Sequence, residues 1–371
     1  MVLMGLSEAV FRRKSSYVFK NRFTVLLFIG VLSMVFAEVY SGASPLWFVN
    51  LWSLFVTFPL YWSHFLFFFT IAIKTKRYSP WALYLWGCLF GLYESWITKV
   101  IWNSFYGQPP LFGRYLGFAV GEMFLVTFFW HPIMSFIVPL LVFEIFSLSS
   151  ERLENFEGQV LSSHMALLKC SKRNLVVAIF LTVFGASIST INFNFNLVIV
   201  TVTILGSLLI ILALHRLSST VAKDLFSIRS LVLERFGFVI VTIYLAVLYV
   251  FSYISILPEN IPSLVTQLIT LMIYVFVGLL LYILCPSNNR EKHYSGACQE
   301  NMKDMFSTKD IWLFYVLFLF LALIFCFVPS LCVVIATCCL FTALGSGIIL
   351  IFTATLKSLA NMKKYMCKAS S

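Results

Sequence analysis

The stretch FNLVIVTVTILGSLLIILAL, residues 195–214, contains twenty residues and no charged side chain. At about 1.5 Å per residue, a helix of this length crosses about 30 Å, the thickness of the hydrocarbon core of a membrane. Within that core the backbone must satisfy its own hydrogen bonds, and a helix does so. The stretch therefore predicts a transmembrane helix.

The rest of the chain has the same character. Of its 371 residues 61% are hydrophobic and 11% are charged, and the mean hydropathy is +0.95. A soluble fold of this length could not bury so much apolar surface. The sequence thus predicts an all-α polytopic membrane protein with ten transmembrane helices, at 23–41, 46–73, 81–104, 115–148, 174–191, 195–214, 236–255, 263–284, 311–328 and 331–356.

The basic residues predict the orientation of these helices. If the N-terminus is cytoplasmic, 24 of the 26 Lys and Arg residues fall on cytoplasmic segments, and Lys99 and Arg114 are the two exceptions. One missed span would reverse the side of every later loop. We therefore expect both termini in the cytoplasm and the protein in the plasma membrane. The net charge of +11 then indicates contact with anionic lipid headgroups, and we do not expect nucleic acid as a partner.

The two halves of the chain differ in polarity. Residues 1–150 contain four predicted spans and eight of the nine tryptophans, together with seven ionisable residues in or beside the spans: Glu38, His64, Glu94, Lys99, Glu122, His131 and Glu144. Residues 174–371 contain six spans without an ionisable residue in their interiors, followed by a basic tail. The first region is the predicted location of a polar site, and the second is a predicted apolar scaffold.

The deepest of these groups is Glu94, in the third span. At about 1.5 Å per residue it lies about 20 Å along this span from the cytoplasmic side, which is in the outer half of the membrane. Glu38 ends the first span and Glu122 begins the fourth, so both reach the same outer level. An ionised side chain at such depth costs about 2.5 to 3.5 kcal/mol on insertion scales. These glutamates should therefore face protein or water.

The charge of these ionisable residues and their positions in the spans predict their roles. Lys99 is five positions from Glu94, so the two do not face each other squarely on a helix. The carboxylate then needs a partner from another span, and Arg114, His131, Glu38 and Glu122 are the candidates. We predict acid–base roles for Glu94, Glu122 and His131 and substrate-binding roles for Glu38, Lys99 and Arg114. The alternatives are structural: an interhelical tie for Glu94, the helix dipole for Glu122, solvation at the interface for Glu38 and a backbone carbonyl as the partner of His131. Lys99 could instead extend its stem to the outer headgroups.

Two predicted spans exceed the membrane thickness. Residues 115–148 would form a straight helix of about 50 Å, and residues 46–73 one of about 42 Å. Because Pro132 removes a backbone hydrogen bond, we expect the helix to bend or end within one turn of His131. We also expect interfacial helices at 46–57 and 116–130, which would cover the glutamates with a lid of four aromatic residues: Trp47, Trp52, Phe118 and Phe124.

One motif is partly matched. Glu94 and Lys99 have the spacing of the first Glu and the Arg in Glu-Glu-x-x-x-Arg, and His131 follows in the next span. This resembles the glutamate-dependent intramembrane proteases of the CAAX-processing type, whose later motifs are Phe-x-x-x-His and His-x-x-x-Asn. The chain has Ser95 in place of the second Glu and Thr127 in place of the Phe, and no second intramembrane His follows. It therefore departs from the family's full pattern.

Three function classes are compatible with this sequence. The first is a membrane-embedded enzyme that acts on a lipid or a membrane-anchored substrate. The second is a proton-coupled transporter, although charges in one half of the chain do not match the inverted repeats of many transporters. The third is a structural subunit of a membrane complex. No motif specifies a cofactor, and no Cys/His cluster predicts a metal site.

Overall fold

Long apolar helices make up most of the protein. The structure is a computed structural model that describes residues 21–105, 108–150, 161–284 and 304–369. In this part of the chain nine helices are long and apolar enough to cross a membrane, which confirms the predicted all-α polytopic fold. They are Asn21–Val39, which ends in η1 (Val35–Val39); η2 (Ser53–Thr57) with α2 (Phe58–Lys74); α6 (Val120–Glu122), η3 (Met123–Ile137) and α7 (Val138–Ser150); α9 (Lys172–Asn192); α10 (Leu197–Thr220); α11 (Arg235–Ser255); α12 (Leu264–Ile283); α14 (Thr308–Phe327); and α15 (Pro329–Ala369).

The third predicted span is not a continuous helix, and this accounts for the difference between nine and ten. It consists of α3 (Pro80–Gly91), α4 (Tyr93–Trp96) and α5 (Val100–Asn103). Lys99 has the left-handed backbone conformation, with φ at 61°, which an α-helix of L-residues cannot continue through. Irregular backbone survives in a membrane only where protein or water covers it. Accordingly, Ile101 and Trp102 of α5 are buried.

Polar side chains fix where several helices begin. Ser79 precedes α3, and its side chain accepts a hydrogen bond from the backbone N–H of Ala82, while Pro80 occupies the first turn. Asn196 caps α10 in the same way. Ser307 and Asp310 form a capping box at the start of α14. Short polar residues thus set helix boundaries that hydropathy alone leaves open.

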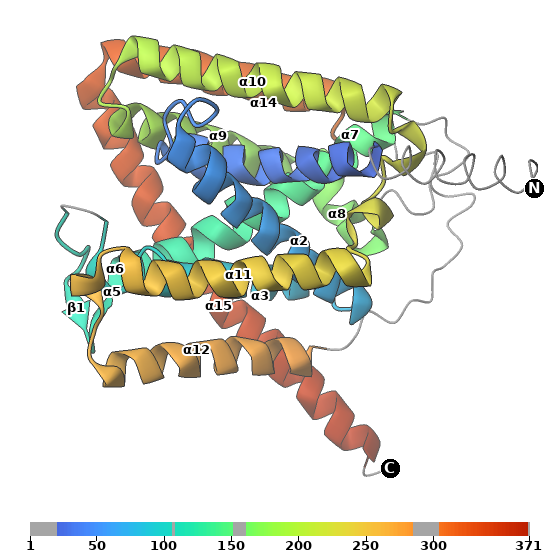
Figure 1. Cartoon of the computed structure of the whole chain (residues 1–371), viewed down its shortest axis with the longest axis vertical. Helices are drawn as coiled ribbons and strands as arrows, with labels where there is room; N and C mark the ends of the chain where they lie inside the picture. Colours follow the sequence, from blue (N-terminus) through green and yellow to red (C-terminus); the bar gives the residue numbers. More distant parts are fainter. Residues whose placement is uncertain (1–20, 106–107, 151–160, 285–303, 370–371) are drawn as a thin grey trace, which may run out of the picture.

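Among the described spans, the Val120–Leu148 helix from the polar first region of the sequence is the most buried. In the most apolar part of the Val120–Leu148 helix 78% of the residues are buried, compared with 17% for α11. Figure 1 shows α10 and α14 side by side along one edge, with α15 crossing the bundle obliquely towards α12. β1 (Arg114–Tyr115) pairs with β2 (Phe118–Ala119) in a short hairpin, which lies near α5 and α6 at one end of the bundle (Figure 1). The opposite end carries α7 and α8 (Met165–Leu168).

Two glycines allow α3 to approach η3 closely. A Cβ atom on Gly87 would lie 2.5 Å from the Cα atom of Pro132, and one on Gly91 would lie 3.0 Å from the Cβ atom of His131. The spacing Gly-x-x-x-Gly is the small-residue pattern that lets membrane helices pack backbone to backbone. Consequently, the end of α3 next to Glu94 lies directly against His131.

The fourth predicted span does not end near His131, so this part of the prediction is wrong. Residues 120–148 form one helix, and Pro132 lies inside its π-helical part, η3. Because π-helices bond each N–H to the carbonyl five residues earlier, the wider turn accommodates a proline that an α-helix would not. The predicted interfacial helix at 116–130 is also wrong at its start, since residues 118–119 belong to the hairpin. Likewise, residues 51–57 continue into α2 as one helix.

Candidate functional site

A polar cavity opens at the end of the bundle that carries α5 and the β1–β2 hairpin. Its volume is about 680 Å³, and its walls come from the first helix, η2, α2, α4, α5 and the segment after α11. Three carboxylates line it, from Glu38, Glu94 and Glu259, together with the guanidinium of Arg114. Such a volume is in the range of about 300 to 1,000 Å³ typical of small-molecule sites.

Glu94 and His131 form a hydrogen-bonded pair at the inner wall of this cavity. The distance from Glu94 Oε1 to His131 Nε2 is 2.9 Å, and Thr98 Oγ1 donates to Glu94 Oε2. His131 Nδ1 lies 2.7 Å from the hydroxyl of Ser135, one turn along η3. An ionised Glu94 only accepts hydrogen bonds, so in that state His131 Nε2 is the donor to it. His131 therefore orients Glu94, and Ser135 orients His131.

Glu38 is joined to this pair through two tyrosines. Tyr61 donates its hydroxyl hydrogen to Glu38 Oε1 at 2.5 Å, and the hydroxyl oxygens of Tyr61 and Tyr93 are 2.8 Å apart. Ser44 donates to the other Glu38 oxygen at 2.5 Å. The Tyr93 hydroxyl also interacts with the Glu94 carboxylate. Glu38 and Glu94, from separate spans, are thus the two ends of one polar chain.

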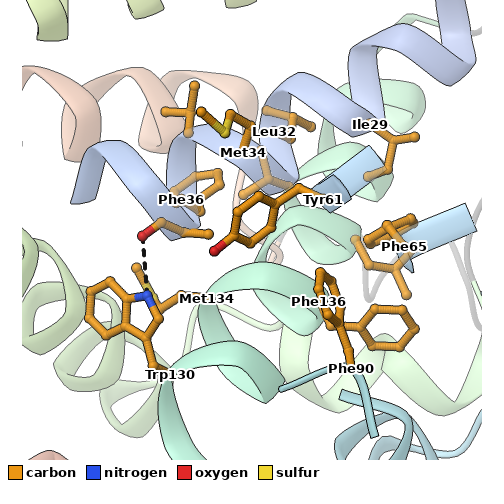
Figure 2. Close-up of a cluster of buried hydrophobic side chains, with 14 of the residues drawn as sticks. Ile29, Leu32, Met34, Phe36, Tyr61, Phe65, Phe90, Trp130, Met134 and Phe136 are labelled. Carbon is orange, nitrogen blue, oxygen red and sulfur yellow. Dashed lines mark hydrogen bonds between the residues drawn. The ribbon is translucent and has the colours of Figure 1, made fainter. Parts of the chain in front are cut away.

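Aromatic packing holds this chain in place. Figure 2 shows Tyr61 between the first helix, which carries Phe36, and η3, which carries Met134. On η3, the indole N–H of Trp130 donates to the carbonyl of Ala37 at 3.1 Å (Figure 2), next to Glu38 in sequence. The ring of Phe90 stacks on the ring of His131 with centroids 5.8 Å apart. The carboxylates are therefore positioned by a rigid, apolar surround, which pre-organises them.

Lys99 has a different environment from the one predicted. It is fully buried, and its ammonium donates to the backbone carbonyls of Ser252 and Ile256 where α11 ends. The last carbonyls of a helix lack intrahelical partners and carry the negative end of its dipole. The observed contacts of Lys99 therefore tie the broken third span to α11. Its predicted role in substrate binding remains untested.

Glu122 lies behind the cavity wall and not in it. Its Oε1 accepts hydrogen bonds from Ser104 Oγ at 2.6 Å and from the backbone N–H of Leu111 at 2.9 Å. These contacts link Ser104, which lines the cavity, to Leu111. Arg114, in contrast, lines the cavity itself, is exposed, and donates to the carbonyl of Asn103 at 3.2 Å. Of the predicted residues, the structure thus brings together Glu38, Glu94, His131 and Arg114.

The predicted aromatic lid is mostly absent from the cavity lining. Trp52 lines the cavity. Trp47 is buried and donates to Ser207 on α10, and Phe118 packs in a small cluster with Trp102. Phe124 contacts Phe128 on η3. The lid prediction fails because it assumed two interfacial helices that do not form.

The tyrosines were missed by the sequence analysis, which searched for charged residues. Tyr93 directly precedes Glu94, and Tyr61 is three residues before His64. Hydroxyl-bearing aromatic residues within apolar spans were the available signal, because a buried tyrosine hydroxyl usually has a hydrogen-bond partner.

A second buried pair lies at the opposite end of the bundle. Glu144 and His164 are both fully buried, and the carboxylate oxygen lies 2.7 Å from His164 Nδ1. His164 Nε2 lies 3.3 Å from the carbonyl oxygen of Tyr78. The pair fixes the segment before α8 to α7. No group of three or more His, Cys, Asp or Glu side chains that could hold a metal ion occurs in the described ranges.

Comparison with known proteins gives two matches. A family model described as an uncharacterized membrane protein family matches residues 27–364. An uncharacterized protein of Archaeoglobus fulgidus is 41% identical over 137 residues, which cover 36% of this chain and 42% of that protein. The chain thus spans less than half the length of the curated relative that it matches. No solved structure matches the chain.

Proposed function

Because the chain belongs to this uncharacterized membrane protein family, we propose a function from its site: a membrane-embedded enzyme that acts on a lipid or membrane-anchored substrate entering from the outer face. The observation that carries the proposal is the Glu94–His131 pair at the wall of a polar cavity. A carboxylate held by a histidine and by Thr98 has a fixed position and orientation. Such positioning is what general acid–base catalysis requires.

Glu94 is the proposed acid–base residue. It is the member of the pair that lines the cavity, so it can take a proton from the attacking hydroxyl of water or of an acceptor alcohol. It then returns this proton to the leaving group. His131 lies behind it as a positioning residue. Arg114 at the same cavity can bind an anionic group of the substrate, such as a phosphate.

The chain from Glu38 to Glu94 supports proton exchange. Its three contacts, Glu38 to Tyr61, Tyr61 to Tyr93 and Tyr93 to Glu94, each need one hydrogen. The two hydroxyls supply two. The third comes from a carboxylic acid, so one of the two glutamates is protonated when the chain is complete. Because Tyr61 donates to Glu38, the protonated group in this arrangement is Glu94. Transfer of one hydrogen along each bond, from Glu94 to Tyr93, from Tyr93 to Tyr61 and from Tyr61 to Glu38, moves the proton to Glu38 and leaves Glu94 ionised as the base.

The test compares wild-type protein with Glu94→Gln in vesicles made from the total lipid extract of the expression host. Gln keeps the size and one acceptor oxygen but cannot serve as a base. We expect new lipid products, detected by mass spectrometry, with the wild type and a loss of at least about 100-fold with the variant, the usual size of a general-base contribution. Absence of products with the folded wild-type protein would contradict a lipid-modifying enzyme.

A proton-coupled transporter is the second candidate, and the Glu38–Glu94 chain is the observation that favours it. The same vesicles, loaded with a pH-sensitive dye, separate the two functions. Proton flux that depends on Glu94, without lipid products, would establish the transporter in place of the enzyme. For either function we propose the plasma membrane as the location, which cell fractionation tests.

A further inference from the structure

A second cavity, which shares no lining residue with the polar cavity, lies between α3, η3, α7, α9 and α14. Its volume is about 540 Å³, and apolar side chains form nearly all of its lining. Ile133 and Ile145 both line it, and these residues are about 18 Å apart along one helix at 1.5 Å per residue. The cavity is therefore long as well as apolar, which suits a hydrocarbon chain better than a compact polar ligand.

One end of this cavity is basic. Arg173, in the first turn of α9, lines it and is exposed, and its described hydrogen bond is a long one of 3.4 Å to Asn174. Trp81 also lines the cavity, and the ammonium of Lys357 lies 5.3 Å from the centre of the Trp81 ring. In the predicted topology this end faces the cytoplasm. Arg173 is thus a cation in the lining of an apolar cavity, and Lys357 contacts another lining residue, Trp81.

Hydrogen bonds fix the part of the cavity wall that lies beside Arg173 in sequence and around α8. Asn174 Nδ2 donates to the backbone carbonyls of Ala166, Leu167 and Lys169, so the segment around α8 is fixed against the start of α9. Ala166 and Leu167 line the cavity. This arrangement keeps the mouth beside Arg173 in a fixed shape.

We propose that this cavity binds an anionic phospholipid of the cytoplasmic leaflet, with one acyl chain along η3 and α7 and its phosphate at Arg173. Basic pockets between transmembrane helices on the cytoplasmic side are suited to acidic headgroups, and each Lys or Arg near the surface contributes about 1 kcal/mol. Loss of Arg173 should therefore reduce the preference for an anionic lipid about fivefold. The proposal does not depend on the function of the polar site.

The experiment measures the lipids retained by the full chain. Purified protein is equilibrated with equal amounts of phosphatidylglycerol and phosphatidylcholine in mixed micelles, and bound lipids are counted by native mass spectrometry. The variants are Arg173→Gln, which removes the charge, and Val177→Trp, which fills the cavity next to it. Arg235→Gln is the control, because Arg235 is an exposed basic residue at the start of α11 and outside the cavity lining.

We expect the wild type and Arg235→Gln to retain phosphatidylglycerol in preference to phosphatidylcholine. Arg173→Gln should lose the preference about fivefold, and Val177→Trp should lose retention of both lipids. If Val177→Trp does not fold, Ala178→Leu replaces it, since Ala178 also lines the cavity. Equal retention by the wild type and both cavity variants would overturn the proposal. In a second mixture, of phosphatidylglycerol and free palmitate, a preference for palmitate would also overturn it, because the occupant would then be a fatty acid.

Discussion

Gly87→Ala should destabilise the protein because α3 and η3 pack backbone to backbone at this position. The new Cβ atom would lie 2.5 Å from the Cα atom of Pro132, whereas ordinary contacts begin at 3.4 Å. The helices must therefore separate by about 0.9 Å. Overpacking of this kind costs about 1 to 3 kcal/mol, and the better helix propensity of alanine offsets about 0.5 to 1 kcal/mol of it. We expect a net loss of about 0 to 2.5 kcal/mol relative to the wild type, and of about 1 to 3 kcal/mol relative to an alanine variant without the steric cost.

The control is Gly278→Ala on α12. No atom lies within 4 Å of a Cβ at Gly278, so this change brings the helix propensity of alanine without the steric cost. Unfolding by sodium dodecyl sulfate in mixed micelles, followed by helical circular dichroism, measures both free energies of unfolding. Gly278→Ala should be as stable as the wild type or slightly more stable.

The same displacement should reach the site. His131 directly precedes Pro132 and bonds Glu94 across 2.9 Å, so a separation of about 0.9 Å exceeds the range of a hydrogen bond. Nitrogen NMR of labelled histidine should then show a changed signal for His131 in Gly87→Ala only. Equal stability of the two alanine variants would refute the close-packing argument, whatever the NMR result.

Three further predictions concern the remaining features. Lys99→Met should lower the free energy of unfolding by about 2 to 4 kcal/mol in the same titration, because it leaves buried carbonyls at the end of α11 without a charged donor. The control is Lys309→Met, at an exposed position. A loss for Lys99→Met no greater than that of the control would contradict the prediction. Glu144→Gln should cost about 1 to 3 kcal/mol, since it removes the charge from a fully buried pair; unchanged stability would show that the pair is not a structural tie. Finally, a cysteine introduced at Ser295, in a chain without native cysteines, should react with a membrane-impermeant reagent only from the cytoplasmic side, and labelling from outside would reverse the predicted orientation.

The fold class could be predicted from sequence, because it depends on local composition, and so does the concentration of ionisable residues in the first 150 residues. An uncharged run of twenty residues such as 195–214 specifies a spanning helix wherever it packs. The cost of a carboxylate in hydrocarbon likewise required Glu94 to have a partner, and His131 was among the candidates. The orientation of the termini remains a prediction, and the first twenty residues lie outside the described part of the chain.

The broken third span and the unbroken fourth one could not be predicted, because tertiary contacts override local rules at both. A proline usually interrupts an α-helix, so the sequence predicted a bend or an end near Pro132. In the structure Pro132 lies inside the π-helix η3, which packs against Gly87. The break occurs instead at Lys99, whose ammonium binds carbonyls more than 150 residues away. The contacts of Lys99 were unpredictable for the same reason.

Hydropathy, charge and helix length determined from the sequence alone that this is a multi-pass membrane protein with ionisable groups in its first half. These quantities act locally, between a segment and the membrane around it. Which groups meet was decided by the tertiary structure: Tyr61 and Tyr93 connect Glu38 to Glu94, while Glu122 and Lys99 are directed to other contacts. Hydrogen bonds depend on distances of tenths of an ångström between helices, and only the packing of the whole bundle sets those distances.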